Sequence, residues 1–174
     1  KASFIFVGLD GVLSGWNGAA GNTALRIQNV ATSVYTGLAL ASSNGANFLY
    51  ASNFKTGNID VFDKTFTQVN KLFKDPNLPA GYSPYNIQNI GDTLFVMYAK
   101  VGSDGTDEAG MGNGFVDMFT TSGTFMKRFA SRGTLNSPWG IAKAPAGFLT
   151  DNMKLYTGTP SAILVGNFGD GKIN

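Results

Sequence analysis

Gly57-Asn-Ile-Asp-Val-Phe62 is one of four copies of a short motif whose spacing decides the fold. Glycine comes first, an aliphatic residue third, a small polar residue fourth and an aromatic residue sixth. The other copies are Gly11-Val-Leu-Ser-Gly-Trp16, Gly114-Phe-Val-Asp-Met-Phe119 and the shorter Gly171-Lys-Ile-Asn174. Their glycines are 46, 57 and 57 residues apart, and turn-rich insertions at 102–112 and 147–158 account for the longer intervals. A period of about 40 to 50 residues is typical of propellers and solenoids.

Short apolar segments recur at fixed places around each motif. A strand-like run precedes every copy, at 4–7, 48–51, 94–97 and 163–165. Another lies further upstream at 35–39, 83–87 and 137–141, and a fourth follows two copies at 66–69 and 125–129. Four short antiparallel strands per unit describe a propeller blade. The sequence therefore predicts an all-β propeller domain over 1–174, with units of about 1–34, 35–82, 83–136 and 137–174.

Composition excludes several classes of function. The chain contains no histidine and no cysteine, which removes the Ser-His-Asp triad, thiolate nucleophiles and cysteine-ligated metal sites. The net charge is +2 and no basic run occurs, so we expect no nucleic-acid partner. The longest apolar stretches are far shorter than the roughly 20 residues that span a bilayer, so we expect no membrane insertion.

Longer stretches resemble a specific family. These are 75–90 (Asp75-Pro-Asn-Leu-Pro to Asn89-Ile90), 112–117, 135–141 (Leu135-Asn-Ser-Pro-Trp-Gly-Ile141) and 164–174. Together they look like a family of uncharacterised, mostly bacterial secreted proteins with NHL-like propeller repeats. The resemblance implies a six-bladed ring about twice this length, of which the chain supplies about three blades, and a secreted or cell-surface location. It implies no activity.

Candidate ligand-binding residues follow from the same analogy, which places them on the face of the propeller that carries the loops near the central channel. They are Asn53, Tyr85, Trp139, Asn167 and Asp170. Tyr85 and Trp139 recur after proline in two units and could stack on sugar rings, or they could pack between blades. Asn53 and Asn167 each precede phenylalanine after a strand, where an amide could instead satisfy backbone groups.

The insertion at 103–108 offers a candidate metal site. Asp104, Asp107 and Glu108 supply carboxylates on a glycine-containing turn, the oxygen ligands that Ca²⁺ prefers. Their spacing does not match an EF-hand loop, and a solvated acidic turn is the alternative. The polar residues that recur once per motif, Ser14, Asp60, Asp117 and Asn174, indicate repeat architecture rather than a catalytic series.

The sequence therefore favours a non-catalytic extracellular module for binding or structure, with a protein or carbohydrate partner. No cofactor other than Ca²⁺ is indicated. Exposed blade edges could pair between copies and build a homo-oligomer or filament, or missing blades could complete the ring. The alternative is a metal-dependent hydrolase or lyase similar to the gluconolactonase-like propeller enzymes.

Overall fold

Antiparallel strands build the whole described structure, which is a computed structural model covering residues 1–145, 148 and 162–174. The insertion expected at 147–158 falls mostly outside these residues. Two central sheets have four strands each, in the orders β4-β5-β6-β7 and β8-β9-β10-β11, which confirms the all-β prediction of four-stranded antiparallel units. A three-stranded sheet, β1-β2-β3, precedes them and a two-stranded sheet, β12-β13, follows.

The strands are short and joined by tight turns. The first sheet contains β1 (Phe4–Val7), β2 (Val12–Trp16) and β3 (Leu25–Asn29), and the second contains β4 (Tyr35–Ser43), β5 (Ala46–Asn53), β6 (Asn58–Phe62) and β7 (Gln68–Val69). The third contains β8 (Tyr82–Ile90), β9 (Thr93–Lys100), β10 (Gly114–Thr120) and β11 (Phe125–Ser131), and the fourth β12 (Pro138–Lys143) and β13 (Ile163–Asn167). One single-turn 3₁₀ helix, η1 (Gly18–Ala20), is the only helix among the described residues, and none there could cross a membrane.

One expected strand is shorter than its sequence suggested. The run 66–69 was expected to be the fourth strand of its unit, but β7 contains only Gln68 and Val69. Phe66 has a φ of 62°, the left-handed conformation that side chains rarely adopt outside turns. It closes a turn in which the Asp63 carboxylate accepts hydrogen bonds from the amides of Thr65 and Thr67. Side-chain bonding within this turn overrides the strand preference of the aromatic residue.

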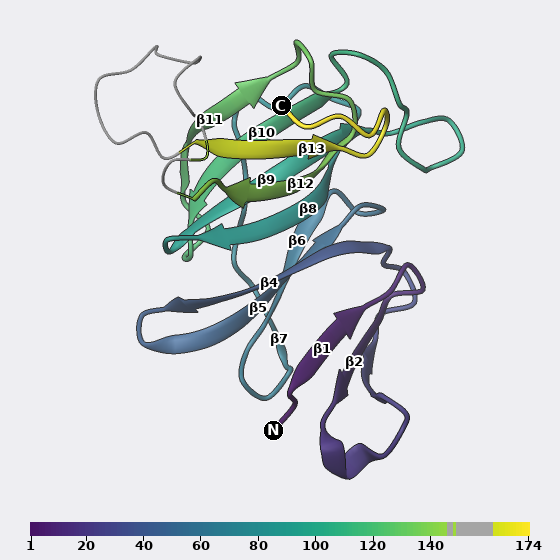
Figure 1. Cartoon of the computed structure of the whole chain (residues 1–174). Coiled ribbons are helices and arrows are strands. Elements are labelled where there is room, and N and C mark those ends of the chain that lie inside the picture. Colours follow the sequence, from purple (N-terminus) through teal and green to yellow (C-terminus); the bar gives the residue numbers. More distant parts are fainter. Residues whose placement is uncertain (146–147, 149–161) are drawn as a thin grey trace.

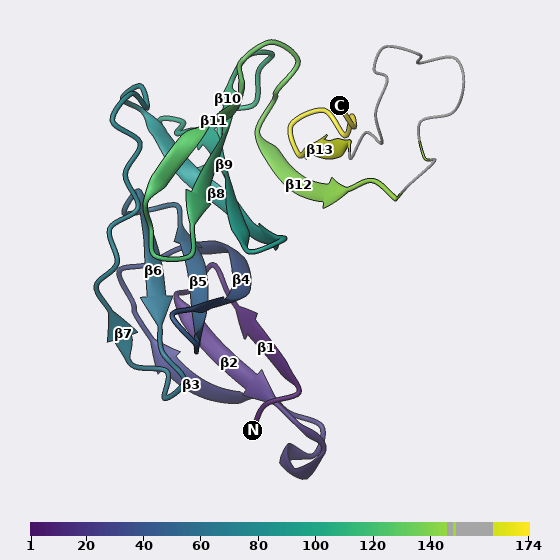
Figure 2. The same ribbon diagram turned by 90° about the vertical axis from the view of Figure 1, so that its left-hand side faces the viewer.

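Consecutive sheets pack face to face, and each interface has its own apolar core (Figures 1 and 2). Leu13, Tyr35, Leu49 and Phe62 fill the space between the first two sheets. Between the second and third lie Tyr50, Val61, Ile87, Val96, Phe115 and Phe119, and between the third and fourth Phe95, Met97, Val116 and Val165. This explains why 94–99 reads as an unbroken apolar run: β9 is buried on both faces.

The strands β4, β8 and β12, each the first of its sheet, contact one another in sequence order. We call these three the inner strands. Amides of β8 reach both neighbours: Asn86 Nδ2 donates to the Trp139 carbonyl at 2.7 Å and Asn89 Nδ2 to the Leu40 carbonyl at 3.2 Å. A Cβ added to Gly37 of β4 would lie 2.8 Å from the Cα of Asn86. The inner strands therefore approach so closely that glycine is required at this contact.

Gly37→Ala tests this contact. We expect the free energy of unfolding to fall by about 1–3 kcal/mol, because the new methyl group must push β4 and β8 apart. Gly18→Ala is the matched control, since nothing lies within 4 Å of its added Cβ. Urea unfolding of both variants makes the comparison. Equal stability of the two would mean that β4 and β8 do not meet at Gly37.

Candidate functional site

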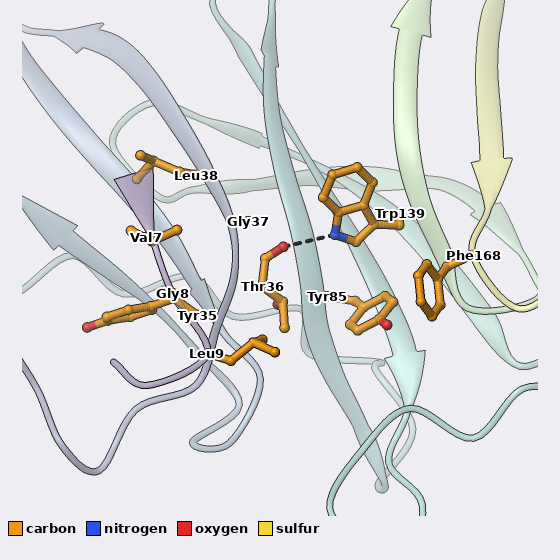
Figure 3. A pocket seen from close by; sticks show the side chains of 10 residues that line it. All are labelled: Val7, Gly8, Leu9, Tyr35, Thr36, Gly37, Leu38, Tyr85, Trp139 and Phe168. Atoms are coloured by element: carbon orange, nitrogen blue, oxygen red, sulfur yellow. Dashed lines mark hydrogen bonds between the residues drawn. The ribbon is translucent and has the colours of Figure 1, made fainter. Parts of the chain in front are cut away.

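A pocket of about 580 Å³ opens where the inner strands meet the turn between β1 and β2 (Figure 3). In Figure 3 Trp139, Tyr85 and Phe168 stand on one side, Val7 and Leu38 on the other, and Thr36 and Leu9 lie between them. The remaining lining residues are Gly8, Tyr35 and Gly37. The pocket therefore brings together two of the residues singled out in the sequence, Tyr85 and Trp139, with several that were not.

Trp139 crosses the pocket to the second sheet. Its indole Nε1 donates a hydrogen bond to the Thr36 carbonyl at 2.9 Å, joining β12 to β4 past the strand between them. The side chain is nonetheless 44% exposed. Trp139 thus fixes its ring by one polar contact and keeps part of the ring free to contact a ligand.

Tyr85 is held more firmly and is only 8% exposed. Its ring packs on Phe54 and Phe168, with centroids 5.2 and 5.9 Å apart. Its hydroxyl donates to Asp107 Oδ1 at 2.8 Å. The pKa of Tyr85 is raised far above its ordinary value. Burial of the ring is the larger cause, and the hydrogen bond to Asp107 adds to it. Tyr85 therefore contributes a fixed, neutral ring to the pocket wall.

Asn53 and Asn167 bind their own chain. Asn53 Nδ2 donates to Ser33 Oγ at 2.7 Å and Asp60 Oδ2 at 2.9 Å, and its Oδ1 accepts from the amide of Val34 at 3.2 Å. Asn167 occupies the corresponding place after β13, where Oδ1 accepts from the Asn136 amide and Nδ2 donates to the Thr134 carbonyl. Both side chains are buried, at 1% and 4% exposure, and each ties the end of a second strand to the segment that leads into an inner strand.

The acidic residues do not converge. Asp104 accepts hydrogen bonds from the amide and hydroxyl of Thr106, and these bonds lower the pKa of Asp104. Glu108 forms an ion pair with Lys100. Asp107 accepts the hydrogen bond of the Tyr85 hydroxyl. No group of three acidic side chains that could hold a metal ion occurs in the part of the chain that the structure describes. Calcium binding stays a prediction, as does ligand binding by Asp170, whose Oδ1 accepts from the amide of Lys172.

A buried ionic group lies away from the pocket, where the chain between the second and third sheets packs on β10 and β11. Arg128 donates through Nη2 to Asp75 and through Nε to Asp117 Oδ1, the latter at 2.7 Å. Asp117 is fully buried and its Oδ2 has no hydrogen-bond partner among the described residues. Burial raises the pKa of Asp117 to about 7, because removal from water disfavours the charged form of the carboxyl group.

Comparisons with solved structures support the architecture. A chain in the crystal structure of a nidogen/laminin complex, which contains a β-propeller, matches 81% of this chain and 48% of its own length, with a TM-score of 0.55 and 18% identity. The fold resembles part of a β-propeller. The described sheets do not close into a ring.

Relatives in sequence are viral. Uncharacterised proteins of Acanthamoeba polyphaga mimivirus are 41% identical over 154 residues, 38% over 151 and 32% over 186, covering 82%, 81% and 100% of the chain. The chain spans about a third of the length of each, at 37%, 34% and 32%. No family model matches. These relatives correct the expected mostly bacterial family, since the proteins found are viral.

Eight of the ten pocket residues escaped the sequence-based interpretation. Leu9, Thr36 and Phe168 were not chosen, although Phe168 directly follows Asn167. The repeat carried a usable signal, because Gly8-Leu9 stands where Asn53-Phe54 stands in the next unit. Leu9 and Phe54 each lie five residues after the residue that pairs with the motif aromatic. The smaller side chain at Leu9 concealed the correspondence.

Asn53→Ala tests whether this amide is structural. We expect the free energy of unfolding to fall by about 2–4 kcal/mol, because Ser33, Asp60 and the Val34 amide all lose a buried partner. Asn58→Ala, at an exposed asparagine in the next strand, is the control. Chemical denaturation measures both variants. An unchanged stability for Asn53→Ala would show that the amide is free for another role.

The raised pKa of Asp117 sets a pH dependence of stability. Because the native state holds this proton up to about pH 7 and the unfolded chain releases it near pH 4, stability is largest at low pH and falls as pH rises through this window. The absence of histidine leaves few other groups to titrate there. We expect a lower urea midpoint at about pH 8 than at about pH 5.

Asp117→Asn cannot ionise, so it should largely remove that difference, whereas Asp92→Asn at an exposed turn should retain it. A midpoint that stays the same at the two pH values in the unmodified protein would mean instead that Arg128 holds Asp117 in its charged form, because such a carboxylate is ionised in both states across this range.

Proposed function

We propose that the chain is part of a non-catalytic β-propeller binding module that takes its ligand in the pocket between the inner strands. The pocket is the observation that carries the proposal. It is lined by residues from all four described sheets, and two of its aromatic residues, Trp139 and Phe168, are 44% and 66% exposed. Concave sites of this size, mostly apolar and with few polar groups, are typical of ligand-binding sites.

The chemistry of the lining supports binding over catalysis. The ten described residues that line the pocket include no carboxylate, lysine or arginine that could transfer a proton or hold a metal ion. The most strongly perturbed carboxylate, Asp117, lies in the ionic group with Arg128 rather than at this pocket. Ion-pair networks within a structure perturb pKa values as catalytic sites do, so the shift of Asp117 does not by itself favour an enzyme.

The wider setting of the module is part of the proposal. We propose that further blades complete a ring, which the resemblance to six-bladed NHL-like proteins suggests, and that the protein acts outside the cell or on a surface. Its partner would be a protein or a carbohydrate. Pairing of sheet edges between copies, for which β1 offers a strand bonded on one side only in the described sheets, would allow an assembly.

A binding screen with one variant tests the proposal. We expect the fluorescently labelled protein to give hits on either a glycan array or a peptide array, and we expect Trp139→Ala to weaken the hits by about 10- to 100-fold, as loss of a central aromatic contact does. Trp16→Phe is the control, because Trp16 bonds to the Gly21 carbonyl away from the pocket.

Circular dichroism should show that Trp139→Ala keeps its strand content. Hits that survive Trp139→Ala unchanged would contradict a binding role for the pocket, and an absence of hits on both arrays would contradict a protein or carbohydrate partner.

A further inference from the structure

The three inner strands share an irregularity that aims one residue of each toward the pocket. The pairing register of β4 with β5 shifts between Tyr35 and Gly37, so Thr36 has no partner. In β8 and β9 the shift lies between Pro84 and Asn86 and leaves out Tyr85, and in β12 and β13 it leaves out Trp139. A β-bulge of this kind redirects a side chain.

These three residues occupy the same position in the repeat. In the second and third sheets, the residues after the bulge, Gly37 and Asn86, pair with Ser52 and Met97. Ser52 and Met97 each lie three residues after a leucine that pairs with the aromatic residue of the motif. These leucine pairs are Leu49 with Phe62 and Leu94 with Phe119. Gly140 pairs with Gly166, which bridges to Ile173 as Ser52 pairs with Ile59. The bulge therefore carries an aromatic ring in two sheets and a threonine in one.

The loop that faces the bulge changes in parallel. In the third sheet the Tyr85 ring packs on Phe54 of the second sheet at 5.2 Å, and Phe54 is 3% exposed. The residue of the first sheet that corresponds to Phe54 is Leu9, because Phe4 pairs with Trp16 as Leu49 pairs with Phe62. Leu9 faces the pocket beside Thr36 and is 69% exposed. Between the second and third sheets, two aromatic rings pack on each other at this position. Between the first and second sheets, the same position holds Thr36 and the exposed Leu9.

The polar groups at the pocket are mostly in use. Trp139 Nε1 bonds to the Thr36 carbonyl, the Tyr85 hydroxyl to Asp107, and Thr36 Oγ1 lies 3.4 Å from Ser52 Oγ. A sugar loses hydrogen bonds to water on binding and needs replacements, which these side chains do not offer. Apolar walls and neutral lining residues suit a flat, uncharged ring, which would contact Trp139 and Phe168 edge to face or offset.

We propose that this pocket binds a neutral planar aromatic ring, seated beside Thr36 and on Leu9, in the position that a ring at the bulge occupies in the third sheet. The inference rests on the proposed function and narrows it to one chemical class. The ring can belong to a free aromatic compound or to an aromatic side chain of a peptide, and both present the same surface to the pocket.

Saturation-transfer NMR with three neutral probes tests the proposal. The probes are free indole, the capped tripeptide acetyl-Gly-Trp-Gly-amide and methyl β-glucoside. We expect indole and the tripeptide to bind and the glucoside to give no signal. Tighter binding of the tripeptide would identify a peptide side chain as the source of the ring, and equal or weaker binding would identify a free aromatic compound.

Thr36→Tyr supplies the ring from the chain itself. Since β8 carries tyrosine at this bulge, the substitution is compatible with the strand and should weaken indole binding by about tenfold or more by filling the site. Thr23→Tyr, at an exposed threonine outside the pocket, is the matched control and should bind as the unmodified protein does. Phe168→Ala removes a wall ring that is 66% exposed, so it should keep the fold and still weaken binding several-fold.

Binding of indole that neither Thr36→Tyr nor Phe168→Ala weakens would overturn the inference, as would the absence of any signal from indole and tripeptide. A glucoside signal lost in Trp139→Ala would overturn the aromatic class while leaving the proposed binding function standing. The proposed function fails separately, when array hits do not depend on Trp139 or when both arrays and all three probes are silent.

Discussion

The close approach of the inner strands is the constraint on which the rest of the structure depends. Each sheet is a short ribbon with apolar residues on its faces, and it is stable only when a neighbour covers them. The backbones of β4 and β8 approach each other closely, which the missing side chain of Gly37 permits. The side-chain amides of Asn86 and Asn89 donate hydrogen bonds to backbone carbonyls of the inner strands on either side of β8. Polar backbone atoms that neighbouring strands would leave unpaired are thereby bonded.

The same constraint creates the pocket. A bulge in each inner strand turns one side chain toward the common centre, so the identity of three residues decides what that centre contains. Two are aromatic and one is threonine, and Trp139 reaches over to the Thr36 carbonyl without filling the space beside Leu9. The repeats therefore share a backbone but differ in the side chain at the bulge, and this difference lies at the proposed ligand-binding pocket.

Sequence reasoning succeeded where the information is local and repeated. Spacing of the glycine motifs and alternation of apolar runs predicted the all-β fold and its four-stranded antiparallel units. It failed where contacts join distant residues or where a side chain competes with the strand: Phe66 lies in a turn closed by Asp63, and the link between Asp75 and Arg128 spans 53 residues without any motif. Only two of the ten residues that line the pocket were singled out from the sequence, because Tyr85 and Trp139 stand out as aromatics after proline whereas Thr36 and Leu9 are unremarkable residues.

The contact between Trp139 and Thr36 gives the most direct test, since it joins residues 103 positions apart in two sheets that are not neighbours. The chain has only two tryptophans, so its ¹⁵N spectrum should show two indole signals, and Trp16→Phe identifies which belongs to Trp139. We expect nuclear Overhauser contacts from the Trp139 indole proton to Thr36 and Gly37, together with slow exchange of that proton with solvent. An indole proton that exchanges freely and shows contacts only within β12 and β13 would contradict the meeting of three inner strands around one pocket.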